Sequence, residues 1–280
     1  MGESRMFPVE ALEEALDFAR EIAFSAGKVG LGWFRRPVTV GLKQDHSPVT
    51  EADRAVEEYL RSRIHRSYPG HAILGEEFGR EGAAGAPVWV VDPIDGTRSF
   101  ITGLPIWGTL IALVQDGLPC LGVIHVPATA ETWHARRGGG AHFTGPGGDM
   151  RPCRTSACRR LSEARFYTTS PDYFDAGEYR RFAALSRAVA VQRYGGDCYP
   201  YGLLASGHVD LVMETQLQPY DFLALAPVIE EAGGVITDWQ GNRLGLDSGL
   251  QVLAAATPEL HAEALALISA RDIGDAHVAG

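Results

Sequence analysis

The sequence predicts an α+β fold in two halves, residues 1–147 and 148–280, and two patterns carry this prediction. The first half contains a series of apolar segments separated by turns rich in Gly and Pro, which is typical of an antiparallel meander. In the second half helical and strand-like patterns alternate, which indicates an α/β arrangement. A chain of 280 residues can form one large domain or two closely packed halves, and both fit the pattern. The predicted strands of the meander are 88–91, 107–115, 119–126 and 130–135.

Two amphipathic helices are predicted before the meander. Apolar residues recur at helical spacing from Val9 to about Phe34, where Pro37 follows and ends the helix. Thr50 has the position of an N-cap, with Asp53 as its capping-box partner, and a second helix follows it. The other segments predicted in this region are a tail over 1–8, a loop or short hairpin over 41–49, a strand over 71–74 and a flexible loop over 79–87.

The second half is predicted to contain four helices and four strands. No internal repeat or low-complexity segment interrupts them, and the chain from about Asp272 onward is predicted to be a tail. In chain order the elements are helix 176–188, strand 190–194, helix 198–206, strand 209–213, helix 221–232, strand 235–237, strand 251–256 and helix 258–270.

The composition is that of a globular protein and excludes several functions. Hydrophobic residues make up 45% of the chain, which is enough for a large core. The formal charge of −10 disfavours nucleic acid and anionic membrane as partners. The 4 cysteines lack C-x-x-C spacing, so zinc is not expected, and no apolar run is long enough to span a membrane. With no secretory signal in the first ten residues, a cytoplasmic location with free thiols is expected.

The segment Asp92-Pro-Ile-Asp-Gly-Thr97 is the strongest candidate for a functional site. It follows a fully apolar predicted strand, and functional residues tend to lie at such strand ends in α/β proteins. Pro93 stiffens the turn and Gly96 permits unusual backbone angles, so two carboxylates and the carbonyl of Ile94 can point to one place. Oxygen ligands of this kind suit Mg²⁺. The alternative is an ordinary solvated acidic turn.

Three further acidic residues occupy comparable positions. Glu76 follows a predicted strand, Asp221 begins a predicted helix, and Asp53 lies in the first turn of another. Each one alone has an ordinary explanation, as a surface turn, a charge that favours the helix dipole, or a cap. Together with the Asp92–Thr97 turn they predict a site that binds several metal ions, which can stabilise the oxygens exchanged in phosphoryl transfer. Neither a P-loop nor a G-x-S-x-G nucleophile elbow occurs in the sequence.

In combination these motifs resemble those of the inositol monophosphatase family. The matching segments are Ser47–Asp53, Gly75-Glu-Glu77, Trp89–Thr97 and Pro219-Tyr-Asp221, which follow in the family's order. The resemblance implies a layered αβαβα sugar-phosphatase fold, two or three Mg²⁺ ions per site, a small phosphorylated metabolite as partner, and a homodimer. It implies metal ligation by the side chains of Glu76, Asp92, Asp95 and Asp221 and by the Ile94 carbonyl.

The same resemblance assigns catalytic and substrate-binding roles. Thr97, with Asp53 and Glu76, would orient and activate the attacking water, while the amides of Gly96 and Thr97, together with Asp95, would hold the phosphate. Contacts to the rest of the substrate would come from Arg193, Asp197 and Glu214. One departure is Tyr220, where the family commonly has Trp.

Two segments resemble the histidinol-phosphatase branch of the family, Arg98–Leu113 and Tyr194–Leu204. Histidinol carries an ammonium group and an imidazole, so an acid such as Asp197 suits it, and Tyr199, Tyr201 or Trp107 would flank the ring. For the residues, the alternatives are an N-cap role for Asp197 and a core position for Trp107. For the whole protein, the alternatives are an inositol-1-phosphatase or another small sugar or nucleotide phosphatase of the same family. A metal-binding protein without turnover is disfavoured, because every ligand position and Thr97 are filled.

Overall fold

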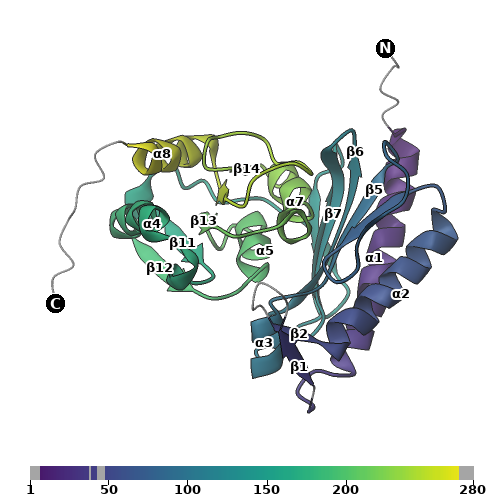
Figure 1. Cartoon of the computed structure of the whole chain (residues 1–280). Coiled ribbons are helices and arrows are strands. Elements are labelled where there is room, and N and C mark those ends of the chain that lie inside the picture. The colour runs from purple at the N-terminus through teal and green to yellow at the C-terminus, as the bar shows by residue number, and fades with distance from the viewer. Residues whose placement is uncertain (1–6, 38, 43–47, 271–280) are drawn as a thin grey trace.

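The computed structural model describes residues 7–37, 39–42 and 48–270, and it has five layers (Figure 1). Two long helices, α1 (Val9–Leu31) and α2 (Glu51–Ser67), cover one face of an eight-stranded sheet. The helices α5 (Tyr199–Ala205), α6 (Pro219–Phe222) and α7 (Leu225–Glu231) lie between this sheet and a five-stranded sheet, whose far face carries α4 (Ala176–Ala188) and α8 (Pro258–Ser269). The expected αβαβα layering is confirmed.

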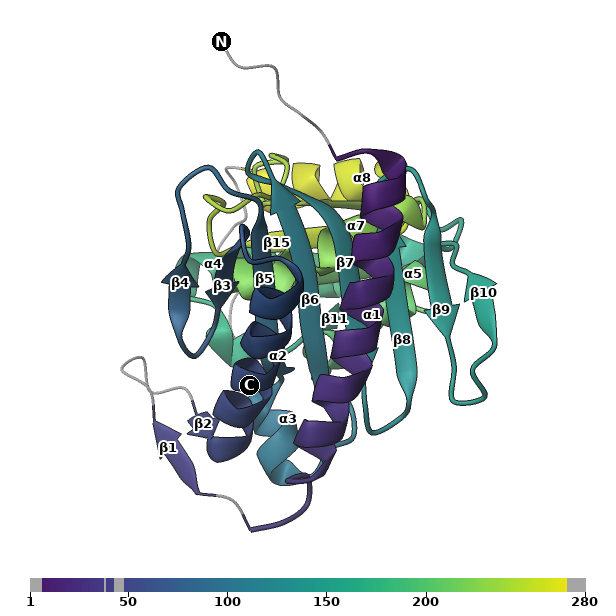
Figure 2. The same cartoon turned by 90° about the vertical axis from the view of Figure 1, so that its right-hand side faces the viewer.

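The eight-stranded sheet contains the predicted meander. Successive strands from β5 to β10 pair antiparallel, whereas β3 and β5 are parallel (Figure 2). The flexible loop predicted over 79–87 is wrong at its start, because residues 79–81 pair with β3 as an edge strand. In spatial order the strands are β10 (Met150–Pro152), β9 (Ala141–Thr144), β8 (Glu131–Arg136), β7 (Leu118–Val126), β6 (Gly108–Gln115), β5 (Val88–Asp95), β3 (Ala72–Gly75) and β4 (Gly79–Glu81).

The five-stranded sheet is mixed. Its central strands β11 and β13 are parallel, and β15 pairs antiparallel with β13 and β14. The predicted strand 209–213 begins later, at Leu211, and strand β11 was not predicted. In spatial order the strands are β12 (Val191–Tyr194), β11 (Arg165–Thr168), β13 (Leu211–Glu214), β15 (Val252–Ala255) and β14 (Val235–Thr237).

The predicted helix 221–232 is wrong as a single element, because the structure divides it into α6 and α7. Pro227 explains the division, since proline has no N–H to donate to the carbonyl of Leu223 and is tolerated only in the first turn of a helix. The helix therefore restarts at Leu225. The helix α1 ends at Leu31 rather than Phe34, although the N–H groups of Trp33 and Phe34 still donate to the carbonyl of Gly30. The backbone leaves the right-handed helical region at Arg35, which adopts φ +58°.

A two-stranded hairpin connects the two long helices. Strands β1 (Val40–Leu42) and β2 (Pro48–Thr50) pair antiparallel, so the hairpin alternative for 41–49 is confirmed at its ends. Residues 43–47, most of the predicted tail over 1–8 and the tail from Asp272 lie outside the described residues. The division at residues 147 and 148 stays a prediction, and it falls in the turn between β9 and β10.

Apolar side chains fill each space between the layers. The helix layer in the middle approaches the large sheet very closely at Gly122 of β7, where a Cβ atom would lie 2.0 Å from the carbonyl oxygen of Ala224. Only glycine permits this approach. No helix within the described ranges is both long and apolar enough to cross a membrane.

Candidate active site

The acidic turn lies at the end of β5, as expected, and its shape comes from an irregularity in the strand. The pairing between β5 and β6 shifts register between Asp92 and Asp95. In a regular strand, side chains three residues apart point to opposite faces of the sheet, and this shift frees the two carboxylates from that alternation. The hydroxyl of Thr109 holds the carbonyl of Pro93 at 2.9 Å. Gly96 then adopts φ +81°, a left-handed conformation that favours glycine, and the short helix α3 (Thr97–Thr102) begins immediately after it.

Three carboxylates from two distant segments meet at this turn. Oxygen atoms of Asp92, Asp95 and Asp221 all lie within 4.8 Å of one another. Asp221 reaches the cluster from α6, where the N–H of Gln218 donates to its carboxylate at 2.6 Å. Glu76, at the end of β3, is close enough to hydrogen-bond with Asp92. The structure therefore brings together all four acidic side chains predicted to bind metal.

The pKa values of these acids show that the cluster is suited to cations. Burial raises the pKa of Asp92 well above its ordinary value, and the charges of its acidic neighbours raise it further. Burial and the charge of Asp197 likewise raise the pKa of Asp95 to about 8, although hydrogen bonds from Cys198 oppose this. Buried like charges repel one another, and divalent cations remove that repulsion. All atoms of the cluster that could bind a metal ion are carboxylate oxygens, the type of ligand that Mg²⁺ prefers.

Thr97 and Asp53 form a second part of the site. The hydroxyl of Thr97 lies 3.2 Å from Oδ1 of Asp53 and 3.3 Å from the carbonyl oxygen of Ile94. The other oxygen of Asp53 accepts from the N–H and the hydroxyl of Thr50, at 2.8 and 2.5 Å. Asp53 is thus both the capping-box partner of Thr50 at the start of α2 and a hydrogen-bond partner of Thr97. A structural role and a role in the site are therefore compatible for this residue.

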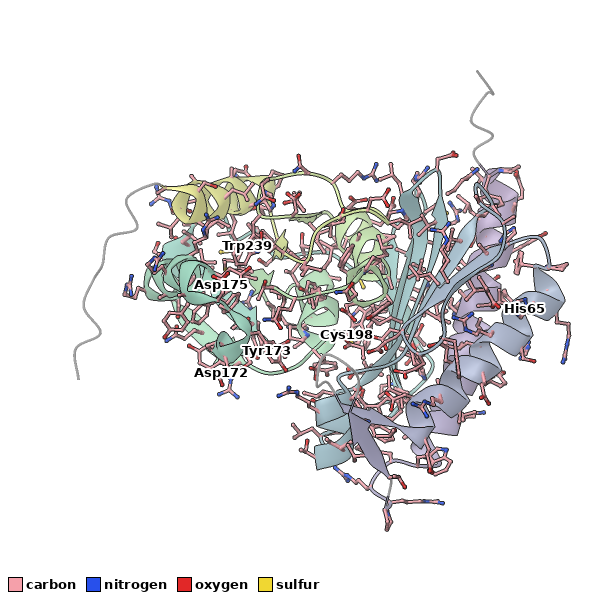
Figure 3. The ribbon with its side chains drawn as sticks, viewed as in Figure 1. His65, Asp172, Tyr173, Asp175, Cys198 and Trp239 are labelled. Atoms are coloured by element: carbon pink, nitrogen blue, oxygen red, sulfur yellow. The ribbon has the colours of Figure 1, made fainter. Side chains whose placement is uncertain are left out.

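A cavity of about 290 Å³ adjoins the carboxylate cluster and lies between the two sheets. Tyr173 and Cys198 line this cavity, and both lie toward the middle of the molecule (Figure 3). Besides Asp95 and Asp221 of the cluster, its wall contains two more acids, the buried Glu214 and the partly exposed Asp197.

The two cavity acids are held by specific hydrogen bonds. Asp197 accepts from the hydroxyl of Ser99 at 2.6 Å. Glu214 accepts from the N–H and the hydroxyl of Thr169, at 2.7 and 2.9 Å. Burial raises the pKa of Glu214 to about 8, despite these hydrogen bonds. Asp197 adopts φ +51°, and it is not the N-cap of α5, which is Cys198.

The other residues predicted near the substrate are divided between this cavity, a neighbouring cavity and the core. Arg193 is exposed on β12 and lines a neighbouring cavity of about 620 Å³, which shares Asp197 with the inner one. Trp107 is fully buried in the core below α1, so its core alternative is confirmed. Tyr201 lines the inner cavity, whereas Tyr199 lines the outer one and its hydroxyl donates to Glu131.

Several residues of the site were not predicted. Thr169 and Ser99 orient the two cavity acids, and the backbone N–H of Cys198 donates to Asp95 at 2.6 Å. Tyr173 closes one side of the cavity and carries the guanidinium of Arg98 above its ring. These contacts connect segments far apart in the chain, so no local sequence signal identifies them.

The fold and the paired carboxylates define a metal-dependent phosphatase of small phosphate esters. The profile of the inositol monophosphatase family matches residues 11–272, and the chain belongs to this family. It is 45% identical over 254 residues to the bifunctional phosphatase IMPL2 of Arabidopsis thaliana, covering 87% of this chain and 72% of the relative. It is 38% identical over 234 residues to the histidinol-phosphatase of Chlorobaculum parvum, covering 83% of this chain and 88% of the relative.

A structural relative agrees with this assignment. An inositol monophosphatase from Zymomonas mobilis superposes with a TM-score of 0.84 at 40% identity, covering 93% of this chain and 99% of the other. The resemblance inferred from the motifs is therefore confirmed, and members of this family depend on Mg²⁺. The names of the relatives differ in their substrates, so the substrate has to be argued from the site.

Proposed function

We propose that this protein is a Mg²⁺-dependent phosphomonoesterase that hydrolyses L-histidinol phosphate to L-histidinol and phosphate, as in histidine biosynthesis. The observation that carries the proposal is a pair of acids in the cavity beside the carboxylate cluster, the buried Glu214 and the partly exposed Asp197. Carboxylates in a poorly solvated cavity favour a cationic partner, and histidinol offers an ammonium group. Inositol carries only hydroxyl groups and gains less from such charges.

The carboxylate cluster beside the cavity would be the metal site. The side chains of Glu76, Asp92, Asp95 and Asp221 and the carbonyl of Ile94 would hold two or three Mg²⁺ ions. Bound Mg²⁺ would polarise the phosphate oxygens and lower the pKa of a water molecule. The protein would keep these ions in place through buried carboxylates that cannot all ionise without them.

The protein's own groups position the reactants. The hydroxyl of Thr97 is directed to Asp53 and the Ile94 carbonyl, so its oxygen would accept a hydrogen bond from the attacking water. Glu76 would orient the same water from β3. Gly96 is the N-cap of α3 and Thr97 is its first residue, and N–H groups at these positions have no partner within a helix. These two N–H groups would bind the phosphate together with Asp95.

The leaving group would occupy the cavity. Asp197 and Glu214 would bind the ammonium group, and the ring of Tyr201, which is 2% exposed and lines the same cavity, would contact the imidazole. Arg193 lies farther out and would act only on parts of a substrate that reach the outer cavity.

A second candidate is inositol-1-phosphate hydrolysis, which is favoured by the similarity to the Zymomonas mobilis inositol monophosphatase. Both candidates use the same metal site, so activity alone does not separate them. A panel of phosphate esters does, and we expect the kcat/KM for histidinol phosphate to exceed that for inositol 1-phosphate at least tenfold. Equal or reversed values would refute the histidinol assignment, and no turnover of any ester would refute the phosphatase assignment.

The variant Asp197→Asn separates the candidates through one residue. It keeps an oxygen for the Ser99 hydroxyl and removes one charge, so kcat/KM for histidinol phosphate should fall about 10- to 100-fold, the worth of a charge-assisted hydrogen bond. Turnover of inositol 1-phosphate should change less than about threefold. Asp172→Asn is the matched control, because Asp172 is exposed next to Tyr173 (Figure 3). Equal losses on both substrates would place Asp197 in the common machinery.

We also propose that the protein is a homodimer, as the family resemblance implies. Light scattering should then give twice the mass of the 30.2 kDa chain. A single-chain mass at micromolar concentration would refute this.

A further inference from the structure

Three charged residues form a buried stripe along α2, which we call the polar stripe. Asp53, Glu57 and Arg61 follow one another at spacings of four residues, so they lie on one face of the helix. They are 0%, 0% and 8% exposed. Charged residues are rarely buried to this degree without specific partners, so the stripe requires an explanation beyond helix packing. Asp53 has one already, because it contacts Thr97 in the candidate active site.

Glu57 binds the turn that follows Glu76. One of its carboxylate oxygens accepts from the N–H of Glu77 at 2.6 Å, and the other accepts from the N–H of Phe78 at 3.2 Å. The carboxylate also touches the backbone on the other side of Glu76. A Cβ atom added at Gly75 would lie 2.1 Å from Oε1 of Glu57, so a larger residue there would displace this carboxylate. Glu57 therefore contacts the chain directly before and directly after Glu76.

Arg61 completes this contact. Its guanidinium donates to Glu57 at 2.8 Å, to the carboxylate of Glu81 at 2.7 Å and to the carbonyl oxygen of Gly79 at 2.5 Å. The charge of Glu57 is thus balanced, and the returning strand β4 is fixed to the same helix. Hydrogen bonds with Glu57 and Arg61 therefore hold both the turn between β3 and β4 and the start of β4 against α2.

We propose that Glu57 and Arg61 are positioning residues that hold the Gly75–Phe78 turn so that Glu76 stays directed at the carboxylate cluster. Glu76 carries the same charge as Asp92 and its neighbours, so repulsion favours moving it away from the cluster. Hydrogen bonds to the adjacent backbone resist that movement. Outer partners of metal ligands commonly change metal affinity by about 10- to 100-fold. The proposal rests on the proposed role of Glu76 as a ligand, but not on the identity of the substrate.

The test is Mg²⁺ binding, measured by calorimetry on full-length protein freed of metal with EDTA. Glu57→Gln keeps the size of the side chain, but its amide group cannot accept from both N–H groups and no longer neutralises Arg61. We expect its Mg²⁺ affinity to fall about tenfold, with an unchanged circular dichroism spectrum. Glu58→Gln is the matched control, because Glu58 lies on the exposed face of the same helix and loses the same charge. An affinity equal to that of the control would overturn the proposal.

Two additional variants distinguish positioning from a general loss of folding. Gly75→Ala displaces the Glu57 carboxylate without removing its charge, and it should reproduce the loss of Mg²⁺ affinity. In a Glu76→Gln background, Glu57→Gln should have almost no further effect, because its target is already removed. Additive losses would mean that Glu57 acts elsewhere. If Glu76→Gln alone leaves Mg²⁺ affinity unchanged, Glu76 is not a ligand and the positioning proposal is wrong with it.

Discussion

Glu214 provides a direct test of the electrostatics of the cavity. It lies at the end of β13 and is 2% exposed. Burial raises its pKa to about 8 from an ordinary value of 4.5, and the charge of Asp197 contributes to the rise. Hydrogen bonds from Thr169 favour the charged form and only partly offset the burial. The perturbation is Glu214→Gln, which keeps the shape and removes the titration.

The sign of the effect follows from where the proton resides. Below pH 4.5 Glu214 is neutral in both states and its contribution to stability is fully present. Between pH 4.5 and about 8 the unfolded chain loses the proton and the folded protein keeps it, so stability decreases as pH rises. The slope for one proton is about 1.4 kcal/mol per pH unit. From pH 5.5 to 7.5 Glu214 should therefore cost the wild type about 2 to 3 kcal/mol of unfolding free energy, and the decrease should level off above about pH 8.

Urea unfolding at several pH values measures this effect, with EDTA present so that metal binding does not vary. The quantity to compare is the difference in unfolding free energy between wild type and Glu214→Gln. Other titrating groups that face the cavity, including Asp197, Tyr173 and Tyr201, are common to both proteins and largely cancel. Wild type should lose stability relative to the variant as pH rises. A difference that stays constant with pH would refute the reasoning.

Three further results are expected. Thr97→Val removes the hydroxyl that orients the water, so kcat should fall about 100-fold or more with little change in KM, and a wild-type rate of phosphate release would contradict this. Binding of L-histidinol at pH 7 should release a proton from Glu214, seen as buffer-dependent heat in calorimetry that Glu214→Gln abolishes. Gly122→Ala should cost about 1 to 3 kcal/mol in urea unfolding because of the carbonyl of Ala224, whereas Gly70→Ala, with open space at its Cβ, should not.

The parts of the site that were predicted depend on short stretches of chain. The Asp92–Thr97 turn and the capping box at Thr50 are local features, and each has a recognisable residue pattern. The meander was predicted for a similar reason, since its strands are buried and apolar. In contrast β4 and β10 were not predicted, because they are exposed along their whole length and lack the apolar pattern by which a strand is recognised.

The contacts that were not predicted depend on which distant segments of the chain become neighbours in the fold. Ser99 meets Asp197, and Thr169 meets Glu214, across long separations in sequence. The first pair forms because α3 lies beside the segment that precedes α5, and the second forms at the ends of the neighbouring strands β11 and β13. No local pattern specifies either arrangement. Glu57 is an intermediate case. Its position four residues after Asp53 indicates the same helix face, but its partners in the Gly75–Phe78 turn cannot be inferred from that spacing.

The site is therefore held by three separate layers of the fold. Asp53 comes from α2, Asp92 and Asp95 from β5, and Asp221 from α6 in the middle layer. The last of these positions depends on how closely the middle layer approaches the large sheet, and Gly122 sets that distance. Because the acids repel one another, the cluster does not assemble itself, and the packing of the apolar layers has to hold it together. Metal affinity should thus respond to packing far from the ligands, and loss of Mg²⁺ binding alone does not identify a residue as a ligand.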